Sequence, residues 1–322
     1  MKLITVILSM ILICFSCSED KVVKVQSDDI EWIGPLNPNG DQGIYDLTSN
    51  EAGTLFYYAG EFDLFRSTDN GSTWSQLANI TEPSVYYIPT LIGGLQNNVY
   101  WIHDKGIFFS SDGGNNWEEQ RIIGTKDYYP GIRISKNGDL FAVTYDSTES
   151  TRLFKSTDMG FNWDEIQCPL VDDKLREMTV DDNYKLYLLS DKGDLYASAN
   201  SGNDWHLVRS GIDIPDQVFD IQIVDKYLFL YNHYYTFDKY DTLGNQYEMN
   251  YIYTDAVKDF EHTIDNTIYA ATQEGIYTTS NFGERWELIP CEIKSIECIH
   301  LTMENYLFIA GHRRIFRSKE KI

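Results

Sequence analysis

The chain has 322 residues, of which 43% are hydrophobic and 14% aromatic, so it is long enough to bury a large core. Its 49 acidic and 26 basic side chains give a formal net charge of -23. This balance excludes a nucleic-acid partner, which requires a basic surface to displace counterions, and it disfavours direct binding to an anionic membrane.

The first segment has the organisation of an export signal. One basic residue is followed by an apolar run from Leu3 to Phe15, which is too short to span a bilayer as a stable anchor. Ser16 and Cys17 resemble the lipobox of bacterial lipoproteins, in which the cysteine becomes the acylated N-terminus. The acidic segment 18–20 resembles the signal that sends Bacteroidota-type lipoproteins to the outer cell face. We therefore expect an outer-membrane lipoprotein exposed at the cell surface, with a plain cleaved secretory signal as the alternative.

An eight-residue pattern recurs five times along the rest of the chain. Its first copy runs from Ser67 to Trp74, with aspartate at the third position, glycine at the fifth and tryptophan at the eighth. The residues at these positions in the five copies are Asp69, Gly71, Trp74, Asp112, Gly114, Trp117, Asp158, Gly160, Trp163, Asn200, Gly202, Trp205, Asn281, Gly283 and Trp286. This is the Asp-box, and the chain resembles the Asp-box (BNR-repeat) β-propellers: sialidases, xyloglucanases, sortilin-type receptors and photosystem II assembly-factor-like proteins. The resemblance implies a fold rather than one function.

The spacing of the copies predicts the number of blades. The tryptophans of successive copies are 43, 46, 42 and 81 residues apart, and a degenerate box from Thr242 to Tyr247 divides the longest step in two. One period before Trp74 lies Trp32. A period near 40 residues built of short strands is typical of four-stranded propeller blades.

A second repeated feature gives the same number. Each repeat has two short apolar strands before its box, such as Leu55 to Tyr58 and Leu64 to Ser67, and seven such pairs occur. The last pair ends at Ser318, where a box and a fourth strand would follow. We therefore predict an all-β, seven-bladed propeller in which an N-terminal strand around Trp32 completes the C-terminal blade. This closure would leave no exposed edge at the seam of the ring.

These features divide the chain into three parts. We expect a signal peptide over 1–16, a tether over 17–26 that begins at an acylated Cys17, and the propeller over 27–322. The box residues are interpreted as structural, because an Asp or Asn side chain can accept backbone N–H groups of its own turn and glycine permits a positive φ. The tryptophan then packs between strands.

A ligand is expected on the face opposite the boxes. Connections between blades share that face with the turns between second and third strands, and the longest of these loops belong to blades two to five. Tyrosine doublets on such loops suit sugar stacking or a protein interface, with packing of the loops onto the rim as the alternative. The candidate ligand-binding residues are Asp127, Tyr128, Tyr129, Arg133, Arg152, Arg176, His233, Tyr234 and Tyr235.

The sequence contains few features that indicate catalysis. The sialidase resemblance implies three arginines that grip a carboxylate, but Arg66 and Arg317 lie directly before boxes and only Arg133 lies on an expected inner strand. A glycosidase with two carboxylates remains an alternative, since such chemistry needs only a suitably spaced pair. Its loop candidates are Asp127, Asp146, Glu149, Asp172 and Asp173. We therefore predict non-catalytic binding of a glycan or a protein, with a glycoside hydrolase and an assembly scaffold as alternatives.

The remaining expectations concern cofactors and association. The internal cysteines Cys168, Cys291 and Cys298 do not form a disulfide framework, although the last two could meet across a short loop. No Cys/His spacing indicates zinc, so neither a metal nor a cofactor is predicted. The propeller is expected to be monomeric and to contact a membrane only through its lipid anchor.

Overall fold

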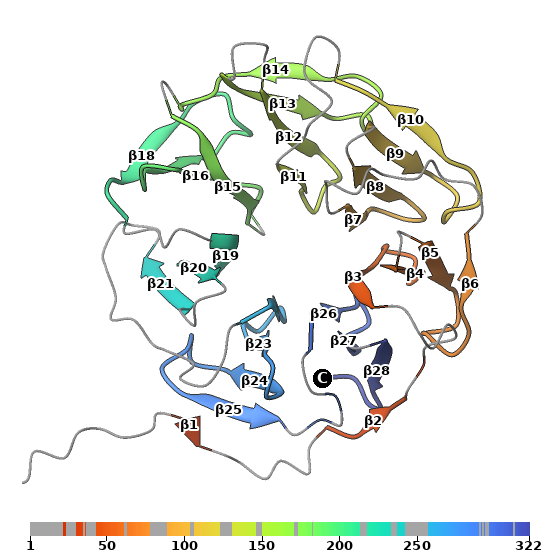
Figure 1. Ribbon diagram of the computed structural model, residues 1–322. Coiled ribbons are helices and arrows are strands. Elements are labelled where there is room, and N and C mark those ends of the chain that lie inside the picture. Colours follow the sequence, from red (N-terminus) through yellow and green to blue (C-terminus); the bar gives the residue numbers. More distant parts are fainter. Residues whose placement is uncertain are drawn as a thin grey trace, which may run out of the picture.

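The computed structural model describes residues 22–23, 30–34, 36, 43–60, 63–77, 89–103, 106–122, 131–145, 150–170, 173–181, 183–212, 218–232, 237–241, 257–289, 291, 293, 296–311 and 313–322. All regular structure within these residues is β-strand, and the strands form seven sheets arranged in a ring (Figure 1). The prediction of an all-β, seven-bladed propeller is confirmed.

Blades 1 to 4 each contain four antiparallel strands in chain order from the centre outwards. Blade 1 consists of β3 (Ile44–Ser49), β4 (Leu55–Ala59), β5 (Asp63–Ser67) and β6 (Ser75–Gln76), and blade 2 of β7 (Thr90–Gly93), β8 (Val99–His103), β9 (Gly106–Ser110) and β10 (Glu118–Gln120). Blade 3 consists of β11 (Gly131–Ile134), β12 (Leu140–Tyr145), β13 (Thr151–Ser156) and β14 (Asp164–Ile166), and blade 4 of β15 (Leu175–Val180), β16 (Leu186–Ser190), β17 (Leu195–Ser198) and β18 (His206–Arg209).

Blades 5 to 7 depart from this pattern. Blade 5 consists of β19 (Val218–Val224), β20 (Tyr227–Asn232) and β21 (Phe237–Asp241), and blade 6 of β22 (Asp259–His262), β23 (Ile268–Ala271), β24 (Ile276–Thr279) and β25 (Trp286–Ile289), with β1 (Val22–Val23) added at its outer edge. Blade 7 consists of β26 (Cys298–Leu301), β27 (Leu307–Gly311) and β28 (Arg314–Ser318), with β2 (Trp32–Ile33) as its outermost strand. The degenerate box predicted at 242–247 lies outside the described residues.

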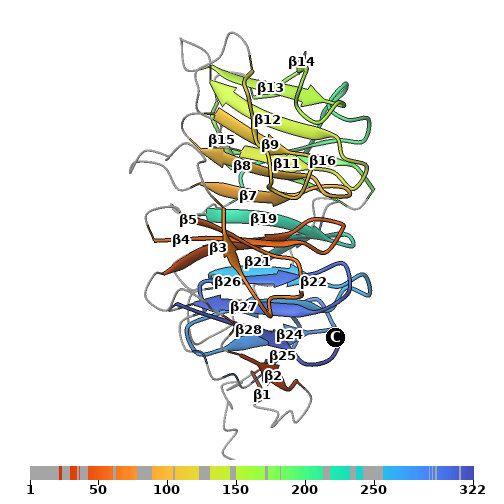
Figure 2. The ribbon, with the colours of Figure 1, turned by 90° about the vertical axis from the view of Figure 1, so that its right-hand side faces the viewer.

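The antiparallel order of the strands gives the ring two distinct faces. Turns between first and second strands, and the boxes between third and fourth strands, lie on one face, which we name the box face. Connections between blades, and turns between second and third strands, lie on the other, which we name the loop face. Figure 2 shows the ring from the side, with the two faces to its left and right.

The hydrophobic core lies between the blades. Both faces of a blade are covered by its neighbours, and the second strand of blade 1, β4, is buried along its whole length. This burial explains why such strands read as continuous apolar runs rather than as an alternating pattern. One cluster joins Tyr57 and Phe65 of blade 1 to Phe308 of blade 7, so the core continues across the seam of the ring.

The N-terminal strand closes the ring as predicted. Trp32 pairs with Ser318 and Ile33 with Arg317, antiparallel to β28. Trp32 also packs against a buried cluster that contains Phe316 and residues of blade 6. The pairing of β1 with β25, parallel and in the register Val22↔Trp286, was not predicted, since these residues fall within the expected tether.

Candidate functional site

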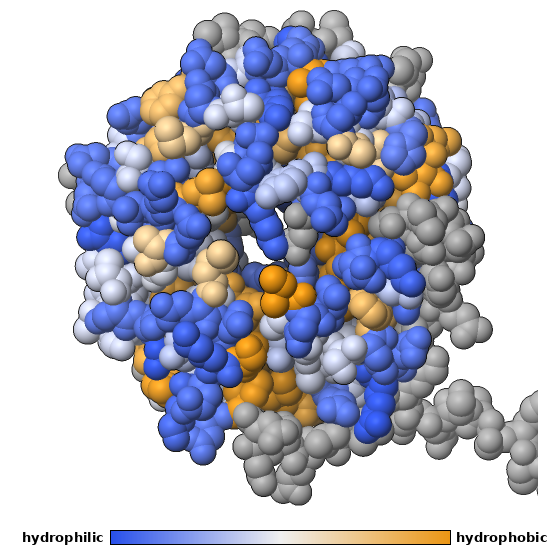
Figure 3. Space-filling model, turned by 180° about the vertical axis from the view of Figure 1, so that it is seen from behind, coloured by the Kyte–Doolittle hydropathy of each residue, from blue (hydrophilic) through white to orange (hydrophobic). Residues whose placement is uncertain are grey.

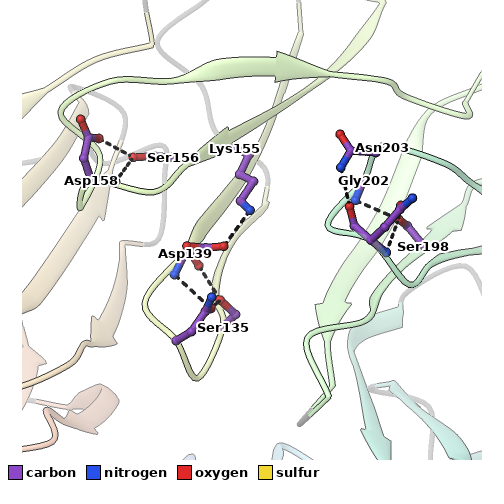
Figure 4. Close-up of polar contacts among 10 residues, drawn as sticks. Ser135, Asp139, Lys155, Ser156, Asp158, Ser198, Gly202 and Asn203 are labelled. Carbon is purple, nitrogen blue, oxygen red and sulfur yellow. Dashed lines mark hydrogen bonds and ion pairs between the residues drawn. The ribbon is translucent and has the colours of Figure 1, made fainter.

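The Asp-boxes are closed hydrogen-bonded turns on the box face. In the first copy the Gly71 amide donates to Ser67 Oγ at 2.9 Å, and the Thr73 amide donates to Asp69 Oδ1 at 2.8 Å. The same contacts recur in blades 3 and 4 around Ser156 and Ser198. Figure 4 shows Ser156 beside Asp158 and Ser198 beside Gly202 in these two turns. The glycine is required at its position, where φ is +78° for Gly71. The hydrogen bonds therefore close each box on itself, and the purely structural role of the box residues stays a prediction.

The box carboxylates are held in their charged form. The pKa of Asp112 is lowered to about 2, chiefly by the hydrogen bond from the Asn116 backbone N–H, and that of Asp158 is lowered by Asn162. The backbone N–H group of the turn needs one acceptor oxygen at this position, and an asparagine side chain also supplies one. This explains why Asn200 and Asn281 occupy the same position in blades 4 and 6.

Basic residues before the boxes connect one blade to the next. Arg66 Nη1 donates to the carbonyl oxygen of Gly113 in the box of blade 2 at 2.7 Å. Lys239 Nζ of blade 5 donates to Phe282 O in the box of blade 6 at 3.0 Å. Lys155 instead forms an ion pair with Asp139 of its own blade at 2.7 Å (Figure 4). Arg66 and Lys239 therefore connect neighbouring blades, whereas Lys155 pairs within its own blade.

Three of the predicted ligand-binding residues lie in the described part of the chain, and each has an acidic partner. Arg133 on β11 forms an ion pair with Glu177 on the neighbouring blade at 2.8 Å. Arg152 on β13 pairs with Glu165 through two nitrogen atoms, at 2.8 and 2.5 Å. Arg176 on β15 lies 3.1 Å from Asp191. The arginines are therefore distributed over two blades, and each one pairs with a different carboxylate.

The other predicted ligand-binding residues lie outside the described residues. They are Asp127, Tyr128, Tyr129, His233, Tyr234 and Tyr235, and the lipidation candidate Cys17 is also outside. Their placement near a ligand stays a prediction.

The described loop face contains an open pocket at the seam between blades 7 and 1. It has a volume of about 380 Å³ and is lined by Gly43, Ile44, Tyr45, Glu297 and Arg313. Tyr45 is 54% exposed, and its ring stacks on that of the buried Tyr58, with centroids 5.8 Å apart. The pocket thus combines an aromatic wall with one cationic and one anionic side chain.

The sequence did not predict this pocket at its observed place. Its residues come from the connection into β3, from the connection into β26 and from the turn between β27 and β28, which are distant in sequence. Arg313 adopts φ +72°, an uncommon value for a side-chain-bearing residue that can mark a functional position. Nothing in the sequence linked the turn from Gly311 to Arg313 with Tyr45 or Glu297.

A second polar cluster lines the wall of the central channel, which opens at the middle of the box face (Figure 3). Ser49 Oγ of β3 lies 2.7 Å from His300 Nε2 of β26, and His300 Nδ1 lies 3.4 Å from Glu261 Oε1 of β22. Thr48 of β3 similarly accepts the Gly93 amide of blade 2 at 3.2 Å. Thr48, Glu261 and His300 each contact the innermost strand of the next blade. The cluster is therefore a contact between neighbouring blades that recurs along the ring.

Asp46 extends these contacts on the same wall. Its carboxylate accepts the backbone N–H groups of Leu47 and Leu91, at 2.8 and 3.0 Å. Burial nevertheless raises the pKa of Asp46 to about 6, against the lowering effect of those two hydrogen bonds and of His300. Asp259 makes the equivalent bond from the Ile299 amide at 3.0 Å. These carboxylates therefore join neighbouring inner strands, because each accepts a backbone N–H group at the unpaired edge of the next strand.

The three cysteines among the described residues, Cys168, Cys291 and Cys298, are free thiols, and burial raises the pKa of the Cys291 thiol to about 11. The described residues contain no group of three or more His, Cys, Asp or Glu side chains placed to hold a metal ion. No helix in the same part of the chain is long and apolar enough to cross a membrane.

The comparisons with known proteins identify the fold of the chain. No protein-family model matches it. A stretch of 135 residues, 36% of the chain, is 28% identical to a sialidase of Bacteroides fragilis (strain YCH46) and spans only 25% of that protein. Among solved structures, YCF48 bound to D1 peptide has a TM-score of 0.69 at 14% identity, over 92% of this chain and 98% of the other.

Two further structures have the same ring architecture. YCF48 from Cyanidioschyzon merolae has a TM-score of 0.60 at 12% identity, covering 89% of this chain and 98% of its own. The extracellular domain of BT4673 from B. thetaiotaomicron has a TM-score of 0.65 at 11% identity, covering 90% and 40% of the two chains. At these identities the likeness is one of fold. The chain is a seven-bladed Asp-box β-propeller, similar in architecture to sialidase-like and YCF48-type propellers.

Proposed function

We propose that the propeller is a non-catalytic binding domain whose loop-face pocket takes a protein or glycan partner. The observation that carries the proposal is the pocket between blades 7 and 1, where the Tyr45 ring is exposed beside Arg313 and Glu297. A flat amphipathic ring beside hydrogen-bonding groups of both charges suits a peptide segment or a sugar ring. The solved complex of YCF48 with D1 peptide supports a protein partner, including an assembly role.

A glycoside hydrolase is the second candidate, because part of the chain matches a sialidase. The pairing of Arg133, Arg152 and Arg176 with separate carboxylates weighs against it, since a sialate grip would need arginines directed at one anion. We also propose that Cys17 carries a lipid anchor that holds the propeller at the outer cell surface, on the strength of the Ser16–Cys17 sequence and the acidic residues that follow it.

One screen separates the two candidate functions. Purified protein is incubated with arrays of sialosides, of plant, algal and host glycans, and of peptides, and both retained ligand and released product are measured. We expect retention without product. Turnover that is abolished by Arg133→Ala or Asp127→Ala would instead establish a hydrolase.

A further inference from the structure

The position of β1 indicates where the chain leaves the ring towards its N-terminus. β1 pairs in parallel with β25, the outermost of the original four strands of blade 6 (Figure 1). β25 begins directly after a box, so its first residue, Trp286, lies at the box-face end of the blade. Val22 pairs with Trp286 and Val23 with Glu287, so Val22, the residue of β1 nearer to Cys17 in the sequence, lies at the box-face end of the rim.

Chain length then limits the distance between this rim and Cys17. Five residue steps separate Cys17 from Val22, and a fully extended chain covers about 3.5 Å per step, which gives about 18 Å at most. An acyl chain on Cys17 would hold the box-face end of blade 6 within that distance of the lipid surface. The loop-face pocket would remain on the opposite side of the ring.

Exposed apolar side chains lie on the same face of the same blades. Ile264, in the turn between β22 and β23 of blade 6, is 87% exposed, and Met303, in the corresponding turn of blade 7, is 73% exposed. Figure 3 shows hydrophobic atoms beside the central opening on this face. Bulky apolar side chains at such exposure, on the same face as the box-face end of β1, are suited to insertion among lipid headgroups.

We propose that the box face of blades 6 and 7 rests against the lipid surface in which Cys17 is anchored, with Ile264 and Met303 in contact with the headgroup layer. The loop-face pocket then faces away from the membrane towards external partners. The neighbouring charges define the kind of surface: Asp265 follows Ile264, and Glu304 follows Met303, with its carboxylate 3.9 Å from Lys321 Nζ. Acidic neighbours favour a zwitterionic surface over an anionic one.

The inference rests on the lipid anchor proposed above, and its failure is distinguishable from failure of the binding proposal. Partner binding is measured at the pocket of Tyr45 and Arg313, and it is expected to persist in a Cys17→Ser variant that has no anchor. Mass spectrometry of the N-terminal peptide from membrane-extracted protein should show an acylated Cys17, and an unmodified cysteine would overturn the inference.

The orientation is tested with the full acylated chain in phosphatidylcholine vesicles that contain a nitroxide-headgroup phosphatidylcholine. A fluorescent amino acid replaces Ile264, Tyr184 or Tyr45 in separate variants; Tyr184 is a 45% exposed control on the box face of blade 4. We expect quenching several-fold stronger at position 264 than at 184, and none at 45. Equal quenching at the three positions, or strongest quenching at 45, would overturn the proposal.

The role of β1 is tested by replacing its two valines. Val22→Pro with Val23→Pro removes two backbone N–H groups, so β1 should no longer pair with β25 and the difference between positions 264 and 184 should disappear. The control pair Val22→Thr and Val23→Thr keeps β-branched residues and should preserve the difference. An undiminished difference in the proline variant would show that β1 does not set the orientation.

Discussion

At the scale of single residues, hydrogen-bonding capacity rather than charge decides which side chains the boxes accept. Asn200 performs in blade 4 the role of Asp112 in blade 2, because each presents one oxygen to the backbone of its own turn. Tyr45 and Arg313 of the loop-face pocket are not part of this repeated turn. A residue that recurs from blade to blade therefore indicates the fold, whereas a residue that does not recur is a candidate for function.

The first prediction concerns Asp112. Asp112→Ala removes the acceptor of the Asn116 amide and should lower the free energy of unfolding by about 1 kcal/mol, while Asp112→Asn keeps an acceptor oxygen and should cost less than half as much. The folded pKa, about 2, lies below the unfolded value. The charged side chain therefore contributes stability above the unfolded pKa and loses it as the pH falls towards 2. Denaturant unfolding between pH 2 and pH 6 should show the wild type and Asp112→Asn converging at the acid end.

Asp46 should show the opposite dependence on pH. Its folded pKa of about 6 lies above its ordinary value of 3.8, so the folded state favours the neutral, protonated side chain. That contribution is fully present below the unfolded pKa and is lost as the pH rises through about 6. The stability of the wild type relative to Asp46→Asn should therefore fall between pH 4 and pH 6 by at most about 3 kcal/mol, because one pKa unit corresponds to about 1.4 kcal/mol. A constant difference across this range would contradict the assignment.

Glycine substitutions test how closely the box of blade 1 is packed. Gly71 and Gly53 have nearly the same φ, +78° and +81°, but an added Cβ would lie 3.0 Å from Phe308 at Gly71 and would meet nothing within 4 Å at Gly53. Both alanine variants bear the strain of a left-handed conformation, about 1 kcal/mol. Gly71→Ala should cost about 1 kcal/mol more, measured by denaturant unfolding, because Phe308 belongs to the core of blade 7. Equal costs would show that the seam accommodates the methyl group.

At the scale of elements, the seam between blades 7 and 1 combines closure of the ring with the pocket. β2 completes blade 7, the Leu36 amide donates to Ile315 O at 2.8 Å, and the chain then leads through Gly43 into β3. The segment that closes the ring therefore ends at the wall of the pocket. Loss of closure should disturb both stability and binding.

Trp32 provides the test of that closure. Trp32→Ala removes a half-buried ring from a cluster that contains Ile309 and Phe316, and it should destabilise the protein by about 2–3 kcal/mol. Glu31→Ala is the control, because Glu31 is exposed and pairs with the exposed Lys319, so the variant should leave the stability nearly unchanged. Deletion of residues 27–36 should lower the melting temperature further. An unchanged melting temperature after the deletion would refute closure by β2.

The sequence allowed the ring to be predicted because every blade repeats the same local interactions. The box at Ser67 to Trp74 and the apolar strands before it depend on neighbours within a few residues, so their spacing alone gave the number of blades and the position of Trp32. The pocket could not be found in that way. Tyr45 and Arg313 are 268 residues apart, and only closure of the ring brings them to one place. The parallel pairing of β1 was missed for a related reason, since two residues have no periodicity.

At the scale of the whole molecule, the propeller separates a structural face from a face suited to binding. The box face carries the hydrogen-bonded turns, the cations that connect blades and the exposed Ile264 and Met303, whereas the pocket opens on the loop face. Under the proposals above, a lipid anchor on the box-face side would leave the pocket free to hold a partner. The acidic net charge of -23 should also speed the approach of cationic partners at low salt.

The central claim is that the loop-face pocket binds the partner, and retention on the glycan and peptide arrays tests it most directly. Tyr45→Ala and Arg313→Ala are compared with Tyr184→Ala, which removes a similarly exposed tyrosine from the box face. For the ligand that the wild type retains best, we predict at least tenfold weaker binding by the two pocket variants, unchanged binding by Tyr184→Ala, and no released product. Equal binding by all three variants, or product formation by the wild type, would contradict the account.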